Sequence, residues 1–244
     1  MSGTAKPVVT IRNLTVKFRY NVALEDINLN IRKGRVLLLG SNGSGKTTLL
    51  RVLSGLLRPT KGNVRVLGLD PFRESGKLYS RMLYSRDVED LPYMLKLSTV
   101  VELLSDAYGA KSVERAVKLL GLEEHLFKRI GELSKGLRRR VSMIEPLASG
   151  RELILMDEPF SGLDADSRII IAKALSELPE ETTLVVASHI PLNLGIDQMI
   201  VLEGGKLSYD GSYNDEVARR YLAWMEEIGK EISGKHLDGD QQGS

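Results

Sequence analysis

A glycine-rich loop between two apolar segments is the feature that most constrains the fold of this 244-residue chain. Val36–Leu39 is a short, continuous apolar run, and after the loop apolar residues recur at helical spacing from Leu49 to Leu53. The loop matches the pattern G-x-x-x-x-G-K-[ST] at every position, through Gly40, Ser41, Asn42, Gly43, Ser44, Gly45, Lys46 and Thr47. The order of these segments predicts a strand, a phosphate-binding loop and a helix.

The chemistry of this loop suits a nucleoside triphosphate. Glycines let successive backbone N–H groups curl around a β-phosphate, and the helix N-terminus adds a positive dipole end. We expect Lys46 to reach the β- and γ-phosphate oxygens and the Thr47 hydroxyl to ligate Mg²⁺, with Thr48 also in the nucleotide site. A glycine-rich turn without a phosphate is the alternative, and the loop alone does not separate a kinase, a GTPase and a motor.

A second apolar strand, Leu153–Met156, ends in two adjacent carboxylates. Successive strand residues point to opposite sides, so the two acids can do different work. We expect Asp157 to hold Mg²⁺, often through water, and Glu158 to polarise the water that attacks the γ-phosphate. An ordinary solvated strand end is the alternative.

Strand and helix patterns alternate along the rest of the chain, as in a parallel α/β sheet. Further strands are predicted at Val8–Leu14, Ile27–Ile31, Val64–Leu67 and Thr183–Ala187, and a helix at about Ser167–Leu178. From about residue 87 to 149 the pattern is helical, which predicts a separate helical subdomain. After about residue 228 the chain loses apolar content, so we expect a frayed tail.

Composition excludes several other classes of protein. A formal charge of +2, from 34 basic and 32 acidic residues, is too balanced for a protein that coats nucleic acid. The absence of cysteine excludes a disulfide framework, thiolate metal sites and a cysteine nucleophile. We find no run of about 18 apolar residues and no apolar stretch like a secretory signal at the start. The expectation is a soluble intracellular chain, unless a partner holds it at a membrane.

A short motif about twenty residues before the acidic pair resembles the signature of ABC-type ATPases. That family has L-S-G-G-Q, whereas this chain has Leu133, Ser134, Lys135, Gly136 and Leu137. The lysine and the second leucine replace a glycine and a glutamine, a variant similar to those of the ATPase subunits of ABC-2-type exporters. With the other motifs, the resemblance covers roughly Val8 to Tyr209.

The resemblance implies roles for three further residues. Phe18 matches an aromatic that stacks on adenine, although Tyr20 is a rival, and Phe18 alone would be read as a packed strand residue. Asp164, in Ser161–Asp164, matches the D-loop that follows the catalytic glutamate, or else a helix cap. His189 matches the switch histidine that contacts the γ-phosphate, or else a satisfied polar group at a strand end. Glu203–Lys206 resembles the closing hairpin turn of the family.

The run Arg138–Arg140 permits several interpretations. Three basic residues in a row are ordinarily a solvated helix face, or a patch that binds phosphate or nucleic acid. The resemblance instead places them on the signature helix.

The resemblance also implies the architecture: a P-loop NTPase (RecA-like) parallel-sheet core with an antiparallel β subdomain and an inserted α-helical subdomain. Residues 1–244 would form a single ABC ATPase domain. Its parts would be a nucleotide-binding core with the β subdomain (1–86 and 150–228), the helical subdomain with the signature motif (87–149) and a flexible tail (229–244).

The implied mechanism uses two subunits, ATP and Mg²⁺. In the family, two ATPase subunits meet head to tail as a homodimer or heterodimer. Ser134 and the Gly136 backbone of one subunit would contact the γ-phosphate bound by the phosphate loop of the other. Hydrolysis at Glu158 would let them separate. The implied partner is a transmembrane permease, which places the chain on the cytoplasmic face of the membrane, and no nucleic acid is expected.

One departure from the family bears on the mechanism. The family usually has a glutamine after the strand that resembles Met82–Tyr84, whereas Ser85, Arg86 and Asp87 follow here. An acidic side chain could reach the metal, and an arginine could not. The next segment, Leu91–Leu104, forms in the family a groove for a coupling helix of the permease, or is simply the core of the helical subdomain.

Two other functions remain at this point. The first is a soluble ABC-type ATPase that acts on nucleic acid or ribosomes, but such proteins usually have two cassettes or a long coiled coil, and no sustained heptads occur here. The second is a regulatory nucleotide-binding module with weak hydrolysis, which only the missing glutamine supports.

Overall fold

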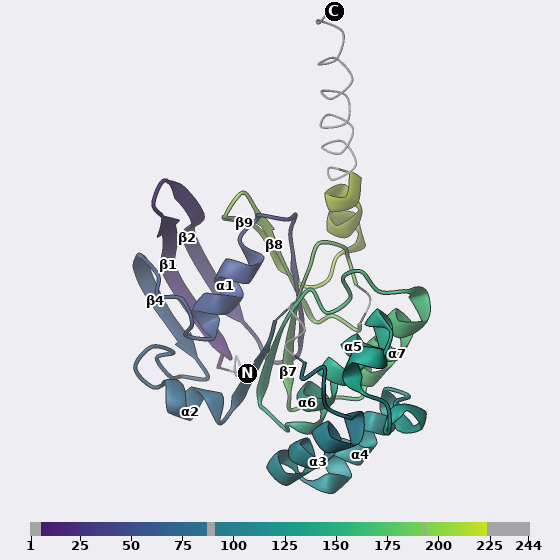
Figure 1. Ribbon diagram of the computed structural model, residues 1–244. Coiled ribbons are helices and arrows are strands. Elements are labelled where there is room, and N and C mark those ends of the chain that lie inside the picture. Colours follow the sequence, from purple (N-terminus) through teal and green to yellow (C-terminus); the bar gives the residue numbers. More distant parts are fainter. Residues whose placement is uncertain (1–5, 87–90, 193, 224–244) are drawn as a thin grey trace, which may run out of the picture.

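The computed structural model describes residues 6–86, 91–192 and 194–223, and its strands form two sheets (Figure 1). The antiparallel sheet has the order β2-β1-β4, with β1 (Val9–Phe18), β2 (Asn21–Ile31) and β4 (Lys61–Val66). The six-stranded sheet has the order β5-β6-β7-β3-β8-β9. Its strands are β3 (Arg35–Leu39), β5 (Met82–Ser85), β6 (Leu153–Asp157), β7 (Thr183–Ser188), β8 (Gln198–Glu203) and β9 (Lys206–Gly211).

The larger sheet is parallel except for β9, which pairs antiparallel with β8. Every residue of β6 and β7 is buried, as expected for strands covered on both faces. This confirms the predicted α/β fold with a parallel sheet beside an antiparallel one.

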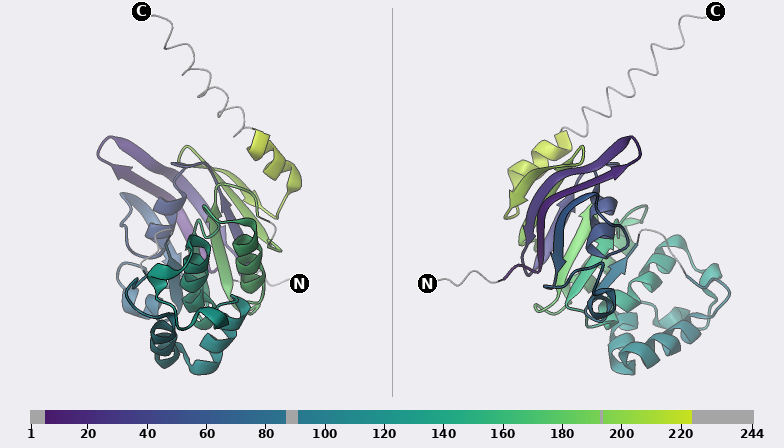
Figure 2. Two further views of the ribbon diagram at one scale, coloured as in Figure 1. Left: turned by 45° about the vertical axis from the view of Figure 1, so that its right-hand side comes forward. Right: turned by 90° about the vertical axis from the view of Figure 1, so that its left-hand side faces the viewer.

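The helices divide between the two faces of the larger sheet. They are α1 (Lys46–Leu53), α2 (Ser75–Tyr79), α3 (Leu97–Tyr108), α4 (Ala110–Leu119), α5 (Lys135–Ser142), α6 (Ile144–Ala148) and α7 (Ala165–Ser176). Short 3₁₀ turns lie at Glu123–His125 and Ile130–Glu132, and residues 215–223 are helical. Figure 2 shows the helices of the teal region as a group to one side of both sheets.

Alternate residues of the central strands enter different cores. Leu155 and Val185 pack with the antiparallel sheet and α1, whereas Ile154 and Val186 pack with the helices that follow β5. Strand periodicity therefore turns one sheet into the shared wall of two cores. Within the described ranges, no helix is long and apolar enough to cross a membrane.

The predicted bounds were too narrow for the first two strands. Strand β1 runs on to Phe18, and β2 begins at Asn21 instead of Ile27. The added part contains the buried residues Val16 and Leu24, but register shifts between Ile11 and Lys17 interrupt the alternation of apolar and polar residues. Its polar side chains lie on the exposed face of the pair, so they do not break the pairing. Helix α7 begins at Ala165 instead of about Ser167, since Asp164 caps it. Residues 229–244, the predicted tail, lie outside the described residues.

Candidate functional site

The glycine-rich loop joins the middle of the parallel sheet to α1. Strand β3 lies between β7 and β8, so the loop after Leu39 emerges at the carboxyl edge, where α/β sheets bind ligands. Gly45, the residue before α1, has a φ of 104°. A Cβ atom there would lie 2.7 Å from the Ala23 carbonyl oxygen. Only glycine meets both conditions, so the loop fits closely under β2.

A cleft of about 520 Å³ opens beside this loop. Its lining includes nine residues of the predicted site: Phe18, Asn42, Gly43, Gly45, Lys46, Thr47, Thr48, Asp157 and Glu158. Gly40, Ser41 and Ser44 belong to the loop but do not line the cleft. Ser44 Oγ is buried without a hydrogen-bond partner among the described residues, which leaves a hydroxyl able to serve a phosphate oxygen.

A charged cluster lies at the inner end of the cleft. Lys46 Nζ donates to the carbonyl oxygens of Gly40 (2.7 Å) and Ser41 (3.1 Å), and it lies 3.3 Å from Glu158 Oε1. The other oxygen, Glu158 Oε2, lies 2.8 Å from His189 Nδ1. Lys46 and Glu158 are 6% and 15% exposed, so solvent screens their attraction only weakly. The Glu158 carboxylate lines the cleft, within reach of a water bound there, and its contact with Lys46 holds it in the ionised form.

The backbone of Glu158 is strained. Its φ is +47°, a left-handed conformation that is uncommon for a residue with a side chain. Its N–H donates to the Ala187 carbonyl (3.0 Å), and its own carbonyl accepts from the Ser161 N–H (3.1 Å). These bonds fix the turn after β6 and aim the carboxylate into the cleft.

Tyr84 contacts the neighbouring acid and was not predicted as a site residue. Its hydroxyl donates to Asp157 Oδ2 at 3.4 Å. Burial, and then the negative charge of Asp157, raises the pKa of Tyr84 to about 12, so the hydroxyl keeps its proton at neutral pH. The sequence signal was faint, because Tyr84 reads as an ordinary apolar residue of a short strand.

The segment after Tyr84 contains the two candidates for the position of the missing glutamine, Arg86 and Asp87. Arg86 lines a separate hollow with Leu91 and Pro92, away from the nucleotide cleft. Asp87, the other candidate, lies outside the described residues.

Thr47 and Asp157 face the same cleft and could hold Mg²⁺ only together with a phosphate. No group of three or more metal-binding side chains occurs in the part of the chain that the structure describes. Mg²⁺ is usually held by one or two carboxylates plus substrate phosphates and waters, so a hydroxyl and a carboxylate are a fitting protein contribution. When bound, the ion would neutralise phosphate charge.

The signature residues lie outside this cleft. Ser134 caps α5, where its Oγ accepts from the Leu137 N–H (3.2 Å). Asp164 caps α7, where it accepts from the Ser167 N–H (2.7 Å), and this bond lowers the pKa of its carboxyl. A Cβ atom on Gly136 would lie 2.4 Å from Ser167 Oγ and 2.7 Å from Asp164 Oδ2. The beginnings of α5 and α7 therefore pack so closely that only glycine fits at 136.

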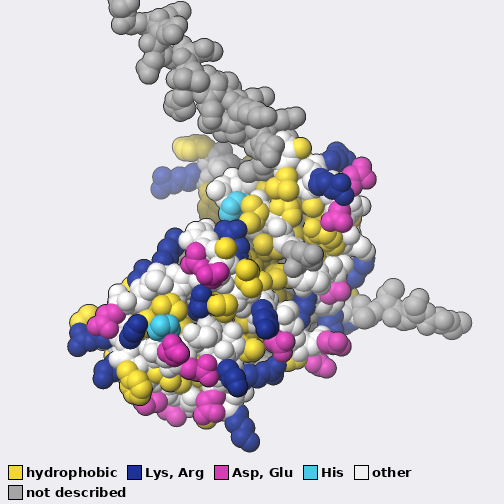
Figure 3. Space-filling view, turned by 90° about the vertical axis from the view of Figure 1, so that its right-hand side faces the viewer, with side chains coloured by type: hydrophobic (Ala, Val, Ile, Leu, Met, Phe, Trp, Pro, Cys, Tyr) yellow, Lys and Arg dark blue, Asp and Glu magenta, His cyan; other side chains and the backbone are white. Residues whose placement is uncertain are grey.

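The arginine run is not a solvated helix face. Arg139 is 3% exposed and donates to the carbonyl oxygens of Pro159 (3.0 Å) and Glu158 (2.9 Å). Arg138 donates to the Leu133 carbonyl and lies over the Tyr93 ring, and Arg140 donates to Ser167 Oγ. On the face shown in Figure 3, basic and acidic side chains are interspersed, with no single-sign patch of the kind that binds nucleic acid.

Of the two aromatic candidates, Phe18 lines the cleft and is 46% exposed, whereas Tyr20 is fully exposed and does not line it. Four lining residues were missed: Asn21, Val22, Ala23 and Gly204. Only Gly204 had a signal, because it lies in the hairpin turn at Glu203–Lys206. Tyr221, also missed, is buried and donates its hydroxyl to the His189 carbonyl (3.3 Å).

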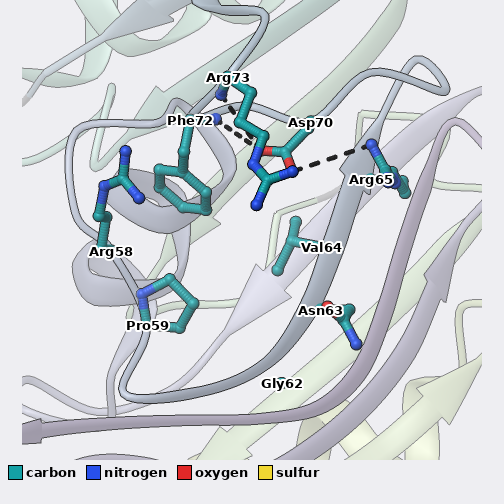
Figure 4. Close-up of a pocket in the computed structure, with 9 residues that line it drawn as sticks. All are labelled: Arg58, Pro59, Gly62, Asn63, Val64, Arg65, Asp70, Phe72 and Arg73. Carbon is teal, nitrogen blue, oxygen red and sulfur yellow. Dashed lines mark hydrogen bonds and ion pairs between the residues drawn. The ribbon is translucent and has the colours of Figure 1, made fainter.

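A second hollow of about 520 Å³ lies between β4 and the segment that precedes α2, and it contains none of the predicted site residues (Figure 4). Asp70 accepts there from the backbone N–H groups of Phe72 (3.0 Å) and Arg73 (3.3 Å). Arg58 lies over the Phe72 ring, and Arg65 is 3.9 Å from Asp70 Oδ2. The arginines are exposed and therefore free to change rotamer, unlike the buried Lys46.

The chain is similar to ATPases of known transporters. The family model described as ABC transporter matches residues 24–161, more than half of the chain. The ABC transporter ATP-binding protein NatA of Bacillus subtilis is 32% identical over 206 residues, which cover 78% of this chain and 82% of NatA. The bacitracin transport ATP-binding protein BcrA of Bacillus licheniformis is 25% identical, over 90% of this chain and 74% of BcrA.

Solved structures agree with this similarity. The dimeric ATP-binding cassette MJ0796, bound to ADP and Pi after hydrolysis, is 26% identical with a TM-score of 0.73, over 84% of this chain and 99% of that one. These matches confirm the P-loop NTPase fold that the resemblance implied. The chain belongs to the ABC transporter family, as an ATP-binding subunit that hydrolyses ATP to power transport.

Proposed function

We propose that this chain binds ATP and Mg²⁺ in the cleft beside the glycine-rich loop and pairs head to tail with a second ATPase subunit. The observation that carries the proposal is the separation of the predicted site into two groups. The phosphate-loop group lines one cleft, and Ser134, Gly136 and Asp164 lie outside it. Two chains in opposite orientation would bring each group against the other, as a two-fold pair allows.

Each residue of the cleft then has a chemical role. Backbone N–H groups of the loop, among them those of Gly43 and Gly45, and the Lys46 ammonium would bind the phosphates. Thr47 and Asp157 would hold Mg²⁺, and Thr48 and Phe18 would contact the rest of the nucleotide.

Hydrolysis depends on Glu158 and His189. Glu158 would accept a proton from the attacking water, and its bond to His189 would orient it. Lys46 would exchange its contact with Glu158 for a contact with the γ-phosphate, which frees the carboxylate to act as a base.

The other half of the sandwich would come from the partner. Ser134 and the first N–H groups of α5 would donate to the γ-phosphate, because they are the unsatisfied donors of a helix start. Asp164 would lie beside them at the interface. The pair would be a homodimer or a heterodimer.

The transporter partner is a membrane permease, which places this chain at the cytoplasmic face of the membrane. A hollow of about 310 Å³ suits the contact, with Leu91, Pro92, Val100 and Leu104 among its lining. Nearby Met94 and Leu103 are 78% and 58% exposed, whereas Leu97 is buried. The segment is therefore partly core and partly an open apolar surface.

An exporter of the ABC-2 kind is the type of transporter we favour. The lysine and leucine in the signature motif support it. The domain limits that we propose are a nucleotide-binding core at 1–86 and 150–228 and a helical subdomain at 87–149, which contains α3 to α6.

Glu158→Gln tests the proposal. We expect ATP hydrolysis to fall by about 10²–10⁴-fold, the usual contribution of a general base. ATP should then hold two subunits together, so an ATP-bound dimer should accumulate in size-exclusion chromatography.

Glu152→Gln is the matched control, because Glu152 lies just before the other end of the same strand and pairs with Arg81 on the surface. It should hydrolyse ATP like the wild type. A wild type that neither dimerises nor hydrolyses ATP would contradict the proposal and favour a regulatory nucleotide-binding module.

A further inference from the structure

Arg139 connects the signature helix to the backbone of the catalytic glutamate. It lies in the second turn of α5 and is 3% exposed. Its Nε donates to the Pro159 carbonyl (3.0 Å), and its Nη2 donates to the Glu158 carbonyl (2.9 Å). Burial of a guanidinium is costly in free energy unless its N–H groups are hydrogen-bonded, so the bonds to these two carbonyls stabilise Arg139 in its buried position.

The carbonyl that Arg139 contacts belongs to the strained residue. Glu158 has a φ of +47°, and such a conformation persists only where surrounding groups enforce it. Two of its fixing bonds run between backbone groups, to Ala187 and from Ser161. Arg139 is the side chain that adds a bond from a different element, α5. A shift of α5 would therefore act on the direction of the Glu158 carboxylate.

Helix α5 is anchored at two further points, both at the start of α7. Gly136 packs against Asp164 and Ser167, and Arg140 Nη2 donates to Ser167 Oγ (3.1 Å). Helix α5 is short and contacts the segment 158–167 through Arg139, Gly136 and Arg140, so the helix and this segment would move together as one unit. Ser134, which caps α5, is thus mechanically connected to Glu158 within one chain.

We infer that Arg139 is a positioning residue that couples the two ATP sites of the dimer. The inference rests on the proposed head-to-tail pair, in which Ser134 of a chain contacts the nucleotide of its neighbour and Glu158 acts on the chain's own nucleotide. The path from Ser134 through Arg139 to Glu158 then runs from one ATP to the other. Closure of α5 on the neighbour's phosphate sets the geometry of Glu158, which makes ATP hydrolysis cooperative.

The test compares Arg139→Met with the wild type in the full chain. Methionine keeps the apolar stem and removes both donors. We expect kcat to fall by about tenfold or more, as small misplacements of catalytic groups do, and the Hill coefficient for ATP to fall to about 1. The affinity of the monomer for a non-hydrolysable ATP analogue should stay within about twofold, because the cleft lining is unchanged.

Two further variants separate the effect of the Arg139 hydrogen bonds from the loss of a positive charge on α5. Arg138→Met removes the same charge from the same helix, where the side chain contacts the Leu133 carbonyl and the Tyr93 ring, and it should keep the wild-type Hill coefficient. Arg139→Lys offers one ammonium in place of a guanidinium fork, so its kcat and Hill coefficient should lie between those of wild type and Arg139→Met. If circular dichroism shows that Arg139→Met does not fold, Arg139→Lys carries the test, and a wild-type kcat and Hill coefficient in it overturn the inference.

The remaining outcomes are distinct. An Arg139→Met protein with a wild-type kcat and Hill coefficient overturns the coupling and leaves the proposed function intact. A lower kcat with an unchanged Hill coefficient reduces Arg139 to a local support of Glu158, which also overturns the coupling. A wild type that neither dimerises nor hydrolyses ATP contradicts the proposed function, and the coupling falls with it.

Discussion

The phosphate-loop region of this molecule forms a lined cleft within one chain, whereas the signature region, around Ser134, Gly136 and Asp164, does not belong to that cleft. In the first, Glu158 lines the cleft and already contacts both Lys46 and His189. In the second, Ser134 and Asp164 cap helices and Gly136 fills a tight contact, but none of them lines that cleft.

This difference teaches what each region needs. The phosphate-loop region can bind a nucleotide by itself, because its donors converge on one concave space. The signature region offers only the donors of a helix start, which is too little for a site without a second surface. Substitutions in the two regions should therefore fail in different ways.

The largest expected effect comes from mixing two inactive variants. Lys46→Ala should lower ATP hydrolysis by at least about a hundredfold and abolish nucleotide binding, because it removes the buried ammonium. Ser134→Ala should also abolish hydrolysis but leave monomer binding of ATP unchanged. A one-to-one mixture should regain at most about a quarter of wild-type activity, since half of the pairs are mixed and each of these has one intact site. The coupling inferred for Arg139 lowers this recovery further, because the neighbour of the intact site binds no ATP.

Each variant mixed with wild type serves as the control for subunit exchange. A mixture in which the subunits exchange but no ATP-dependent mixed dimer forms would contradict the head-to-tail arrangement. Recovery measured as released phosphate, together with dimer formation on size-exclusion chromatography, gives the answer.

A smaller effect is expected for Gly136→Ala. The added Cβ would collide with Ser167 Oγ, which Arg140 and Asp164 also hold, so α5 must shift. Overpacking of this kind costs about 1–3 kcal/mol in the free energy of unfolding. Hydrolysis should fall while ATP binding by the monomer is retained.

Gly76→Ala is the matched control, because Gly76 lies in α2 with open space around it and a negative φ. It should stabilise the protein by about 0.4–1 kcal/mol through the unfolded chain. Thermal unfolding of both variants measures the contrast, and equal melting temperatures would show that the α5 contact is looser than the structure indicates.

The smallest effect is expected for Tyr84→Phe, which removes the hydroxyl next to Asp157. One hydrogen bond contributes about 0.5–1.5 kcal/mol, so kcat should fall by no more than about tenfold. Burial raises the pKa of Tyr84 to about 12. The contribution of this hydroxyl to the free energy of unfolding should therefore be full below about pH 10 and should be lost as the pH rises through about 12.

Tyr79→Phe is the control for loss of a tyrosine hydroxyl, since Tyr79 donates to the Ser54 carbonyl (2.9 Å), away from the cleft. Tyr79→Phe should lower the free energy of unfolding by about 0.5–1.5 kcal/mol, the contribution of one hydrogen bond, and it should leave kcat unchanged. Equal kcat values for the two variants and the wild type would show that the Tyr84 hydroxyl has no role in catalysis.

Much of the nucleotide cleft could be predicted from the sequence, because its residues lie in two short segments with strict spacing. The loop from Gly40 to Thr47 follows β3, and the pair Asp157–Glu158 lies at the end of β6, with β7 between the two strands. Parallel strands end at one edge of a sheet, so both segments reach the same edge. Asn21, Val22 and Ala23 escaped prediction, since they contribute through the position of a hairpin and have no chemical signature.

The sequence by itself determined the family, the sheet and the phosphate loop, since local spacing and apolar periodicity encode them. Only the tertiary structure decided that Arg139 is buried against the Glu158 carbonyl, that Tyr84 contacts Asp157 and that the signature residues do not line the cleft of their own chain. These contacts join segments that are far apart in the chain, and the partner of a side chain depends on how the elements pack.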